Sequence, residues 1–279
     1  MAGKQKMELA AVNTAAALKK EKHLEELLHS FRNVTVAFSG GVDSAYLLGR
    51  AVQVLGREQV QAVTLKSALN PPGEVEEAAS FALKLAVRHR VMNIDISAER
   101  ELMANTSERC YVCKRSCFGR LSEVSAAGGF QAVLDGSNAD DLNDYRPGMR
   151  AAEELGIRSP LLEASLGKDE IRLLSKMRGY ATWDKPSAAC LASRIPYGQE
   201  ITPEKLKKVA DAECFLRQVG VKTDLRVRFH DNLARIEINS SDLDCVMRYR
   251  KEIAARLQVI GFTYVTLDLD GFESGSLNR

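Results

Sequence analysis

Residues 34–48 read VTVAFSGGVDSAYLL and join a strand-like segment to a helix-like segment through two adjacent glycines. The run from Val34 to Phe38 is short, apolar and β-branched, which is typical of a buried parallel strand. From Ala45 onward, good helix formers carry apolar residues at helical spacing. Adjacent glycines allow a tight turn and close approach to a ligand, and the first amides of a helix carry the positive end of its dipole. The segment therefore predicts an anion-binding turn of the kind that holds phosphate.

The glycine turn matches neither of the two common nucleotide motifs. No Gly-Lys-Ser/Thr follows it, so it is not a Walker A loop, and it is not the dinucleotide-binding fingerprint. A plain strand-to-helix turn, with glycines for compactness, is the alternative interpretation. The turn resembles the pyrophosphate loop (PP-loop) of the ATP pyrophosphatase superfamily, whose members cleave ATP between its α and β phosphates. That resemblance implies nucleotide binding by Ser39, Gly40, Gly41, Asp43 and Ser44.

Strand-like and helix-like segments continue to alternate after this turn. We expect further strands at 60–65, 91–96 and 132–134, and helices at 45–55, 74–89, 108–127 and 168–178. This spacing predicts an α/β fold with a doubly wound parallel sheet, of the adenine nucleotide alpha hydrolase type that the PP-loop resemblance implies. In such sheets ligands bind beyond the carboxyl ends of the strands, so the loops that follow the strands should surround one crevice.

The pattern changes near residue 202, where two consecutive strands lie between helices. We expect a helix to about 219, strands at 225–229 and 234–238, a helix at 242–260 and a strand at 264–269, which together form a smaller α+β domain. The predicted division is a helical arm at 1–30, a PP-loop domain at 31–185, a cysteine-bearing linker at 186–200, and a substrate-binding or oligomerisation domain at 201–279.

The composition is that of an ordinary globular protein. The 279 residues carry a formal net charge of +2, and 27% of them are charged, which gives no sign of a dedicated nucleic-acid binder. No apolar run reaches the roughly 18 residues of a membrane span, and the amino-terminal stretch is too polar for a signal peptide. The six cysteines are unevenly spaced, which favours functional thiols in a reducing cytoplasm over a disulfide framework.

Two further segments carry residue types that bind metals. Cys110 and Cys113 form a Cys-x-x-Cys motif, which can be a redox pair, half of a zinc site or part of an iron–sulfur site. The segment 135–148 follows a predicted strand and contains four aspartates. Mg²⁺ prefers oxygen ligands and shared phosphate oxygens, so this loop could bind it. The alternative is a solvated loop with a helix-capping aspartate.

Reactive and anion-binding side chains occur later in the chain. Cys190 lies in an aperiodic segment close to Lys185 and Arg194, and nearby cations favour the nucleophilic thiolate; the alternative is a small buried hydrophobe. Arg226 and Arg228 alternate on a predicted strand and so share one face, where arginine suits phosphate or carboxylate. A solvated strand face is the alternative there. The four histidines fit no catalytic or metal motif.

These segments together closely resemble the LarE family of ATP-dependent sulfur transferases. The resemblance runs from about residue 25 to 278 and includes DYRPG at 144–148, CLASRIPYG at 190–198 and GFESGSLN at 271–278. It implies that ATP and Mg²⁺ serve to adenylate a carboxylate of a pyridinium dicarboxylate mononucleotide, which becomes a thiocarboxylate in the assembly of the nickel-pincer nucleotide cofactor. It further implies a homo-oligomer, contact with other enzymes of that assembly, and substrate binding by Arg194, Arg226, Arg228 and Glu237.

The same resemblance makes Cys190 the expected sulfur-delivering residue. In one route Cys190 is sacrificial: it attacks the adenylate, and its Cβ–S bond then breaks to leave dehydroalanine and a thiocarboxylate. In the other, favoured here, Cys110, Cys113 and Cys190 hold a [4Fe–4S] cluster whose open iron binds an extra sulfide, as in the three-cysteine branch of the family. A zinc site would need Cys117 as a fourth ligand, although Cys117 and the two remaining cysteines, Cys214 and Cys245, are expected to be structural.

Two other functions remain as alternatives. The first is a tRNA-thiolating enzyme or another PP-loop adenylating enzyme, and the second is a regulatory protein that binds ATP without turning it over. A basic RNA-binding extension or a glutaminase domain would favour the first, and the sequence shows neither. Release of pyrophosphate on addition of a carboxylate substrate would separate an enzyme from a regulatory protein.

Overall fold

The computed structural model describes residues 2–143, 147–186 and 189–273. Its contacts divide the chain into two compact units, which are described separately. The first contains Met1–Lys66, Gly73–Ile94 and Cys110–Lys185, and the second contains Ser67–Pro72, Asp95–Arg109 and Pro186–Arg279. Two short segments that follow the second and third strands therefore group with the carboxyl-terminal part of the chain. The four-part division expected from the sequence stays a prediction.

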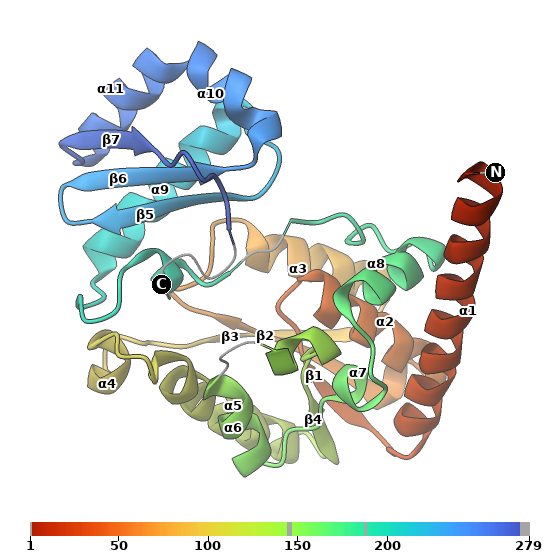
Figure 1. Cartoon of the computed structure of the whole chain (residues 1–279). Helices are drawn as coiled ribbons and strands as arrows, with labels where there is room; N and C mark the ends of the chain where they lie inside the picture. Colours follow the sequence, from red (N-terminus) through yellow and green to blue (C-terminus); the bar gives the residue numbers. More distant parts are fainter. Residues whose placement is uncertain (1, 144–146, 187–188, 274–279) are drawn as a thin grey trace. The chain divides into compact units, whose positions relative to one another are not determined.

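The first unit is built on a four-stranded parallel sheet (Figure 1). Its strands are β1 (Val34–Ala37), β2 (Val60–Lys66), β3 (Arg88–Asn93) and β4 (Ala132–Leu134), and their order in the sheet is β3-β2-β1-β4. At the centre, Val36 pairs with Ala62 on one side and with Leu134 on the other. The predicted parallel α/β sheet is confirmed.

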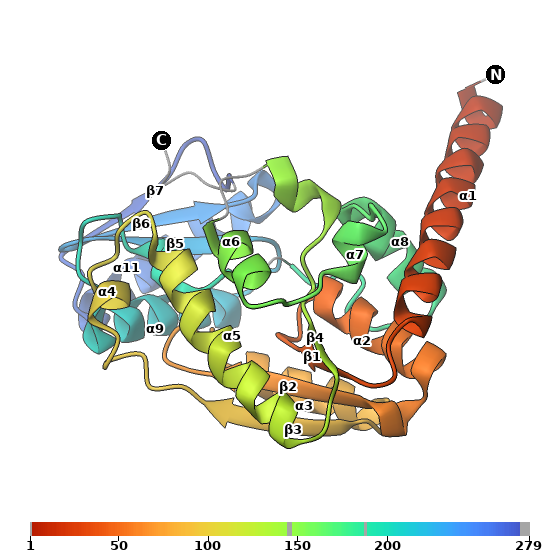
Figure 2. The same cartoon turned by 90° about the horizontal axis from the view of Figure 1, so that it is seen from below.

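Helices cover both faces of this sheet, because alternate strand residues point to opposite sides. On one face Val34, Val36 and Ala62 share a core. It is packed by α1 (Ala2–His29), α2 (Val42–Leu55), α3 (Glu74–Lys84), α7 (Pro160–Glu163) and α8 (Lys168–Met177). On the other face Val63 and Val133 form a second core. That core is packed by α5 (Arg109–Ala127) and α6 (Pro147–Glu154) (Figure 2). The sheet is therefore doubly wound, as the spacing predicts.

A buried polar network fixes α1 to this unit. Glu21 on α1 accepts hydrogen bonds from the Tyr46 hydroxyl at 2.8 Å and from the Arg178 guanidinium at 2.6 Å, and Arg50 Nε lies 3.3 Å from it. Burial raises the pKa of Glu21, but the bonds from Arg178 and Tyr46 outweigh it and hold the pKa below its ordinary value. None of the helices in the described part of the chain is long and apolar enough to cross a membrane.

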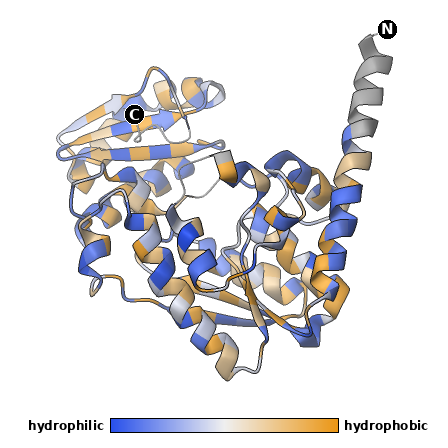
Figure 3. Cartoon of the chain, turned by 60° about the horizontal axis from the view of Figure 1, so that its bottom comes forward, coloured by the Kyte–Doolittle hydropathy of each residue, from blue (hydrophilic) through white to orange (hydrophobic). Residues whose placement is uncertain are grey.

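The second unit contains a three-stranded sheet in the order β5-β6-β7. The strands are β5 (Leu225–His230), β6 (Leu233–Ile238) and β7 (Tyr264–Leu267), and the helices are α4 (Arg100–Met103), α9 (Pro203–Val219), α10 (Leu243–Arg248) and α11 (Arg250–Ile260). β5 and β6 are antiparallel, whereas β7 runs parallel to β6. Hydrophobic and hydrophilic residues alternate along β5 and β6 (Figure 3). The expected smaller α+β domain is confirmed.

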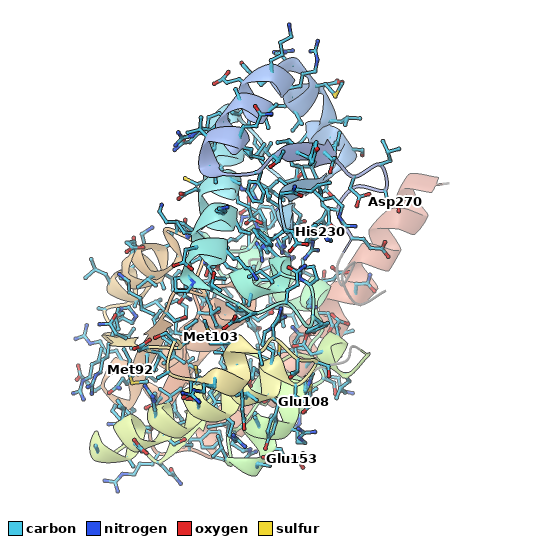
Figure 4. All side chains as sticks on the ribbon, turned by 90° about the vertical axis from the view of Figure 1, so that its left-hand side faces the viewer. Met92, Met103, Glu108, Glu153, His230 and Asp270 are labelled. Carbon is cyan, nitrogen blue, oxygen red and sulfur yellow. The ribbon has the colours of Figure 1, made fainter. Side chains whose placement is uncertain are left out.

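Three elements differ clearly from their predicted bounds. The third strand begins at Arg88 instead of Val91, and α3 ends at Lys84 because Ala86 takes a φ of 51°. β3 lies at the sheet edge. Its Arg88 and Arg90 are exposed, while Met92, labelled in Figure 4, packs against the second core. The expected helix 242–260 is divided into α10 and α11 at Tyr249, whose backbone angles (φ −98°, ψ 13°) are not helical.

Candidate functional site

The glycine turn lies between the carboxyl end of β1 and the start of α2, as the sequence predicts. Gly40 has a φ of 78°, and a Cβ atom there would lie 3.0 Å from the Cβ of Ala78 on α3. Gly41 occupies the N-cap position of α2 and has no side chain with which to cap it. The Ser39 hydroxyl oxygen accepts from the Gly41 amide at 3.3 Å and lies 3.0 Å from Ser44 Oγ. The turn thus holds its own shape and leaves helix-start amides for an anion.

Hydrogen bonds from β2 and β3 fix Phe38, the residue that precedes the turn. The Thr64 hydroxyl on β2 donates to the Phe38 carbonyl at 2.7 Å and lies 2.8 Å from His89 Nε2. Because the single hydroxyl proton of Thr64 goes to Phe38, His89 Nε2 must donate to Thr64 Oγ1. Burial lowers the pKa of His89, so the imidazole is neutral near pH 7. His89 therefore helps to hold Thr64 against the strand residue that precedes the turn.

The loop after β4 approaches the start of α2 closely. A Cβ atom on Gly136 would lie 3.0 Å from the backbone nitrogen of Ser44. Asn138 in the same loop donates from Nδ2 to Asp43 Oδ2 at 3.1 Å. Neither Gly136 nor Asn138 was predicted as a site residue from the sequence. The available signal was a glycine two residues after a predicted strand, at the carboxyl edge of the sheet.

Electrostatics set Asp43 apart from the other carboxylates of the unit. Burial raises the pKa of Asp43 to about 6, and repulsion from the nearby carboxylate of Asp141 adds to this rise. Asp141 is itself buried, and Lys168 Nζ lies 3.5 Å from its Oδ1. Two repelling carboxylates beside an anion-binding turn are oxygen ligands that suit a divalent cation, and the Asn138 amide nitrogen holds Asp43 in place.

The remaining aspartates of the predicted magnesium loop stabilise the structure. Asp135 accepts from the hydroxyls of Ser137 at 2.7 Å and Ser159 at 2.6 Å. Asp140 accepts from the backbone amide of Lys168, the first residue of α8, at 2.6 Å. The fourth aspartate, Asp144, lies outside the described residues. Among the described aspartates of this loop, Asp141 is thus the one whose charge acts on Asp43.

Lys185 is a cation at the glycine turn that sequence reasoning placed only near Cys190. Its Nζ donates to the Gly40 carbonyl at 3.1 Å and forms an ion pair with Glu77 Oε2 at 2.8 Å. Arg172 on α8 donates to the carbonyls of Trp183 and Lys185, at 2.9 and 2.8 Å. These bonds fix the backbone that presents the lysine.

Cys110 and Cys113 lie near the start of α5. Because they are three residues apart on a helix, their side chains lie on one side of it. Cys110 is exposed and Cys113 is half-buried. A Cβ atom on Gly148 of α6 would lie 2.6 Å from Lys114 Cδ, so α6 packs closely on this part of α5. Within the described residues of either unit, no three His, Cys, Asp or Glu side chains converge in an arrangement that could hold a metal ion.

Cys190 belongs to the second unit and is exposed. It precedes the short 3-10 turn Leu191–Arg194, in which the Ser193 amide donates to the Cys190 carbonyl at 2.9 Å. Arg194 Nη1 also donates to that carbonyl, at 3.1 Å, and the Leu191 amide bonds the Leu69 carbonyl at 2.9 Å. The thiol is therefore presented on a well-anchored backbone. Ser187 and Ala188, which precede it, lie outside the described residues.

The predicted substrate-binding residues Arg194, Arg228 and Glu237 lie together in the second unit, in buried ion pairs. Arg194 pairs with Glu213 of α9 through two hydrogen bonds of 2.8 and 2.9 Å. Arg228 pairs with Glu237 at 2.8 Å and donates to the Ser193 carbonyl at 2.7 Å. Both arginines thus also hold the Cys190 turn. Sequence reasoning missed Glu213, because nothing in the helical pattern of α9 marks it as a partner of a distant loop.

Arg226 differs from the other two arginines in its electrostatic environment. Burial lowers its pKa to about 10, and repulsion from Arg194 and Arg228 contributes to the shift. Its guanidinium lies 5.0 Å from the centre of the Phe272 ring. The cluster therefore carries a positive potential that would favour an anion.

The chain is similar to known proteins around the glycine turn and over most of the rest of its length. The NAD synthase family model matches residues 17–112, which include the turn. An uncharacterized protein of Synechocystis sp. is 41% identical over 262 residues, covering 93% of this chain and 97% of the relative. Pyridinium-3,5-bisthiocarboxylic acid mononucleotide synthase of Lactiplantibacillus plantarum is 39% identical over 259 residues, covering 93% of this chain and 94% of that enzyme. The chain belongs to the LarE family.

The LarE-family relationship covers both units of the structure. An uncharacterized protein of Methanocaldococcus jannaschii is 32% identical over 257 residues, covering 92% of this chain and 97% of the relative. The match to the NAD synthase family, by contrast, ends at Val112. The glycine turn thus lies in the part of the chain that is similar to NAD synthases, whereas the similarity to the Lactiplantibacillus plantarum enzyme covers nearly the whole chain.

Proposed function

We propose that this LarE-family protein is an ATP-dependent sulfur transferase of the pyridinium-3,5-bisthiocarboxylic acid mononucleotide synthase type. It adenylates a carboxylate of a pyridinium dicarboxylate mononucleotide and converts it to a thiocarboxylate, in the assembly of the nickel-pincer nucleotide cofactor. The observation that carries the proposal is the 39% identity to the Lactiplantibacillus plantarum enzyme over 93% of this chain, with the glycine turn inside the match.

The chemistry requires a nucleotide site and a sulfur source. A carboxylate resists attack by a thiolate because both are negative and oxide is a poor leaving group. Adenylation masks the charge and makes AMP the leaving group, which divides one difficult step into two easier ones. The amides of Gly40–Ser44 and the start of α2 hold the phosphates while the carboxylate attacks the α-phosphate and pyrophosphate leaves.

Asp43 and Asp141 are the residues that would hold Mg²⁺, and Asn138 would position Asp43 through its amide nitrogen. The carboxylate oxygens are the ligand type that Mg²⁺ prefers, and their mutual repulsion favours cation binding. Mg²⁺ bound there would supply positive charge that neutralises the departing pyrophosphate. The protein's own contribution is to bring two carboxylates to the edge of the anion-binding turn.

We propose Cys190 as the residue at which sulfur is delivered. For a [4Fe–4S] group, Cys110, Cys113 and Cys190 would be the ligands; the thiolate chemistry fits, and two of these residues share one side of α5. Such a group would supply a replaceable sulfide, and Cys190 would survive turnover. The sacrificial route instead forms a thioester from Cys190 with loss of AMP. Loss of the Cys190 α-proton then breaks the Cβ–S bond.

Substrate recognition falls to the arginine cluster of the second unit. Arg226, flanked by Arg194 and Arg228, offers a positive site for the phosphate or carboxylate of the mononucleotide. Glu237, paired with Arg228, orients that guanidinium. We further propose that the protein is a cytoplasmic homo-oligomer that works with other enzymes of the same assembly, and that its second unit serves substrate binding or oligomerisation.

The test is anaerobic purification with iron and sulfide assays, followed by intact-mass measurement after turnover with ATP and substrate. A Cys190 peptide lighter by the mass of H₂S supports the sacrificial route. Stoichiometric iron with an unchanged Cys190 supports the cluster route. Replacement of Cys110 by Ala abolishes activity in the second route only. If carboxylate substrate releases no pyrophosphate from ATP, the enzymatic proposal is wrong and a regulatory ATP-binding protein is favoured.

A further inference from the structure

Lys185 is the last residue of the first unit, and its ammonium group lies on the glycine turn. Its side chain is only 18% exposed, and its Nζ donates to the Gly40 carbonyl at 3.1 Å. Gly40 is the residue whose positive φ shapes the turn. The ammonium therefore lies beside the backbone that presents the amides of Val42, Asp43 and Ser44 at the start of α2.

The ion pair of Lys185 with Glu77 is one that a stronger anion can displace. Glu77 lies in the first turn of α3, and its side chain is 64% exposed, so solvent screens the attraction. Lysine carries three N–H donors on a compact charge. Among the described residues, the Gly40 carbonyl and Glu77 account for two of those donors. A phosphate at the turn could be bound by the third donor or take the place of Glu77.

The backbone around Lys185 is held independently of its side chain. Arg172 donates to the carbonyls of Trp183 and Lys185, and the Lys185 amide bonds the Thr182 carbonyl at 3.1 Å. Removing the side-chain charge should therefore leave the segment in place. This makes Lys185 a preorganised cation, which is what electrostatic stabilisation of a leaving group requires.

We propose that Lys185 is a triphosphate-binding residue that contacts the β- or γ-phosphate of ATP, exchanging Glu77 for phosphate when ATP binds. The proposal rests on the proposed function, because it takes the glycine turn to be the ATP site. The ammonium then stabilises the departing pyrophosphate, and it distinguishes ATP from AMP. After pyrophosphate leaves, Lys185 returns to Glu77.

The test compares binding of a nucleotide that cannot be cleaved between its α and β phosphates, α,β-methylene-ATP, with binding of AMP. Both are titrated with Mg²⁺ into the full-length protein by calorimetry. In Lys185→Met the dissociation constant of the ATP analogue should rise on the order of 10- to 100-fold, as for the loss of one charge-assisted hydrogen bond. AMP binding should change less than about 2-fold by the same reasoning, because AMP lacks the β- and γ-phosphates.

Glu77→Gln separates phosphate binding from a purely structural role. If Glu77 competes with phosphate, its neutralisation should tighten binding of the ATP analogue by about 2- to 5-fold. If the ion pair merely holds the turn, the same variant should weaken binding, as Lys185→Met does. Lys176→Met is the matched control, because Lys176 is an exposed cation on α8 that lies over the Trp183 ring; it should leave both constants unchanged.

The outcomes distinguish this inference from the proposed function. Equal weakening of ATP-analogue and AMP binding in Lys185→Met, no weakening of either, or weaker binding in Glu77→Gln would overturn the role of Lys185. If the wild-type protein binds neither nucleotide, the proposed function itself is wrong. Should Lys185→Met fail to fold, as judged by thermal unfolding, Glu77→Gln still gives an answer, because its expected effect has the opposite sign.

Discussion

At the residue scale, the carboxyl group of Asp43 should make Mg²⁺ binding depend on pH. Burial and the charge of Asp141 raise the pKa of Asp43 to about 6, and only the deprotonated carboxylate binds the cation. The apparent Mg²⁺ affinity should be constant above about pH 7 and should fall about 10-fold per pH unit well below pH 6. Mg²⁺ titrations of ATP-analogue binding at pH 5, 6 and 7.5 measure this. Asp141→Asn removes the repulsion and should move the fall to lower pH; a move to higher pH contradicts the explanation.

The same pKa shift has a consequence for stability. The folded-state pKa of Asp43 lies above its ordinary value of 3.8, so the folded protein binds the proton more tightly than the unfolded chain does. The stabilisation of the fold by the proton on Asp43 is therefore fully present below about pH 4 and is lost as pH rises through about 6. In the absence of Mg²⁺, Asp43→Asn should stabilise the fold at pH 7.5, by up to about 3 kcal/mol. Its advantage should vanish toward pH 4, which urea unfolding at both pH values measures.

At the element scale, the packing of α2 against the segment after α8 depends on Gly49 having no side chain. A Cβ atom on Gly49 would lie 2.4 Å from the Tyr180 ring and hydroxyl, whose neighbours Tyr46 and Phe81 form further edge contacts. Gly49→Ala should therefore destabilise the fold by about 1–3 kcal/mol through overpacking. Gly119→Ala is the control, because a Cβ there meets nothing within 4 Å. Urea unfolding measures the stability of both variants. If Gly49→Ala is as stable as the control, the Tyr180 ring does not limit how closely α2 packs against it.

The sequence could predict those elements in which local pattern and tertiary environment agree. β1, the glycine turn and α2 were predicted because a buried central strand must be apolar on both faces. β3 begins three residues earlier than predicted, because an edge strand tolerates Arg88 and Arg90. The apolar run starts within the strand, and its buried residues Ile94 and Ile96 lie after the strand end. Gly136, Glu213 and Lys185 were missed as contacts because each acts on a segment distant in sequence, and only the folded chain brings them together.

At the scale of the whole molecule, the cysteines proposed for sulfur transfer are divided between the units. Cys110 and Cys113 belong to the first unit and Cys190 to the second. A [4Fe–4S] group bound by these cysteines would stabilise the folded protein, because a ligand held only by the native state adds to its stability. The iron-loaded protein should then unfold at a higher temperature than the iron-free protein.

Variants of single cysteines test this stabilisation without reference to turnover. Cys190→Ala should lower both the bound iron and the unfolding temperature in anaerobic calorimetry, and Cys110→Ala should do the same. Cys117→Ala is the matched control, since Cys117 lies on α5 with Cys110 but is expected to be structural; iron content and unfolding temperature should be unchanged. If Cys190→Ala keeps full iron and the wild-type unfolding temperature, Cys190 is not a ligand. Sulfur delivery by the sacrificial route then becomes the better explanation for its exposed thiol.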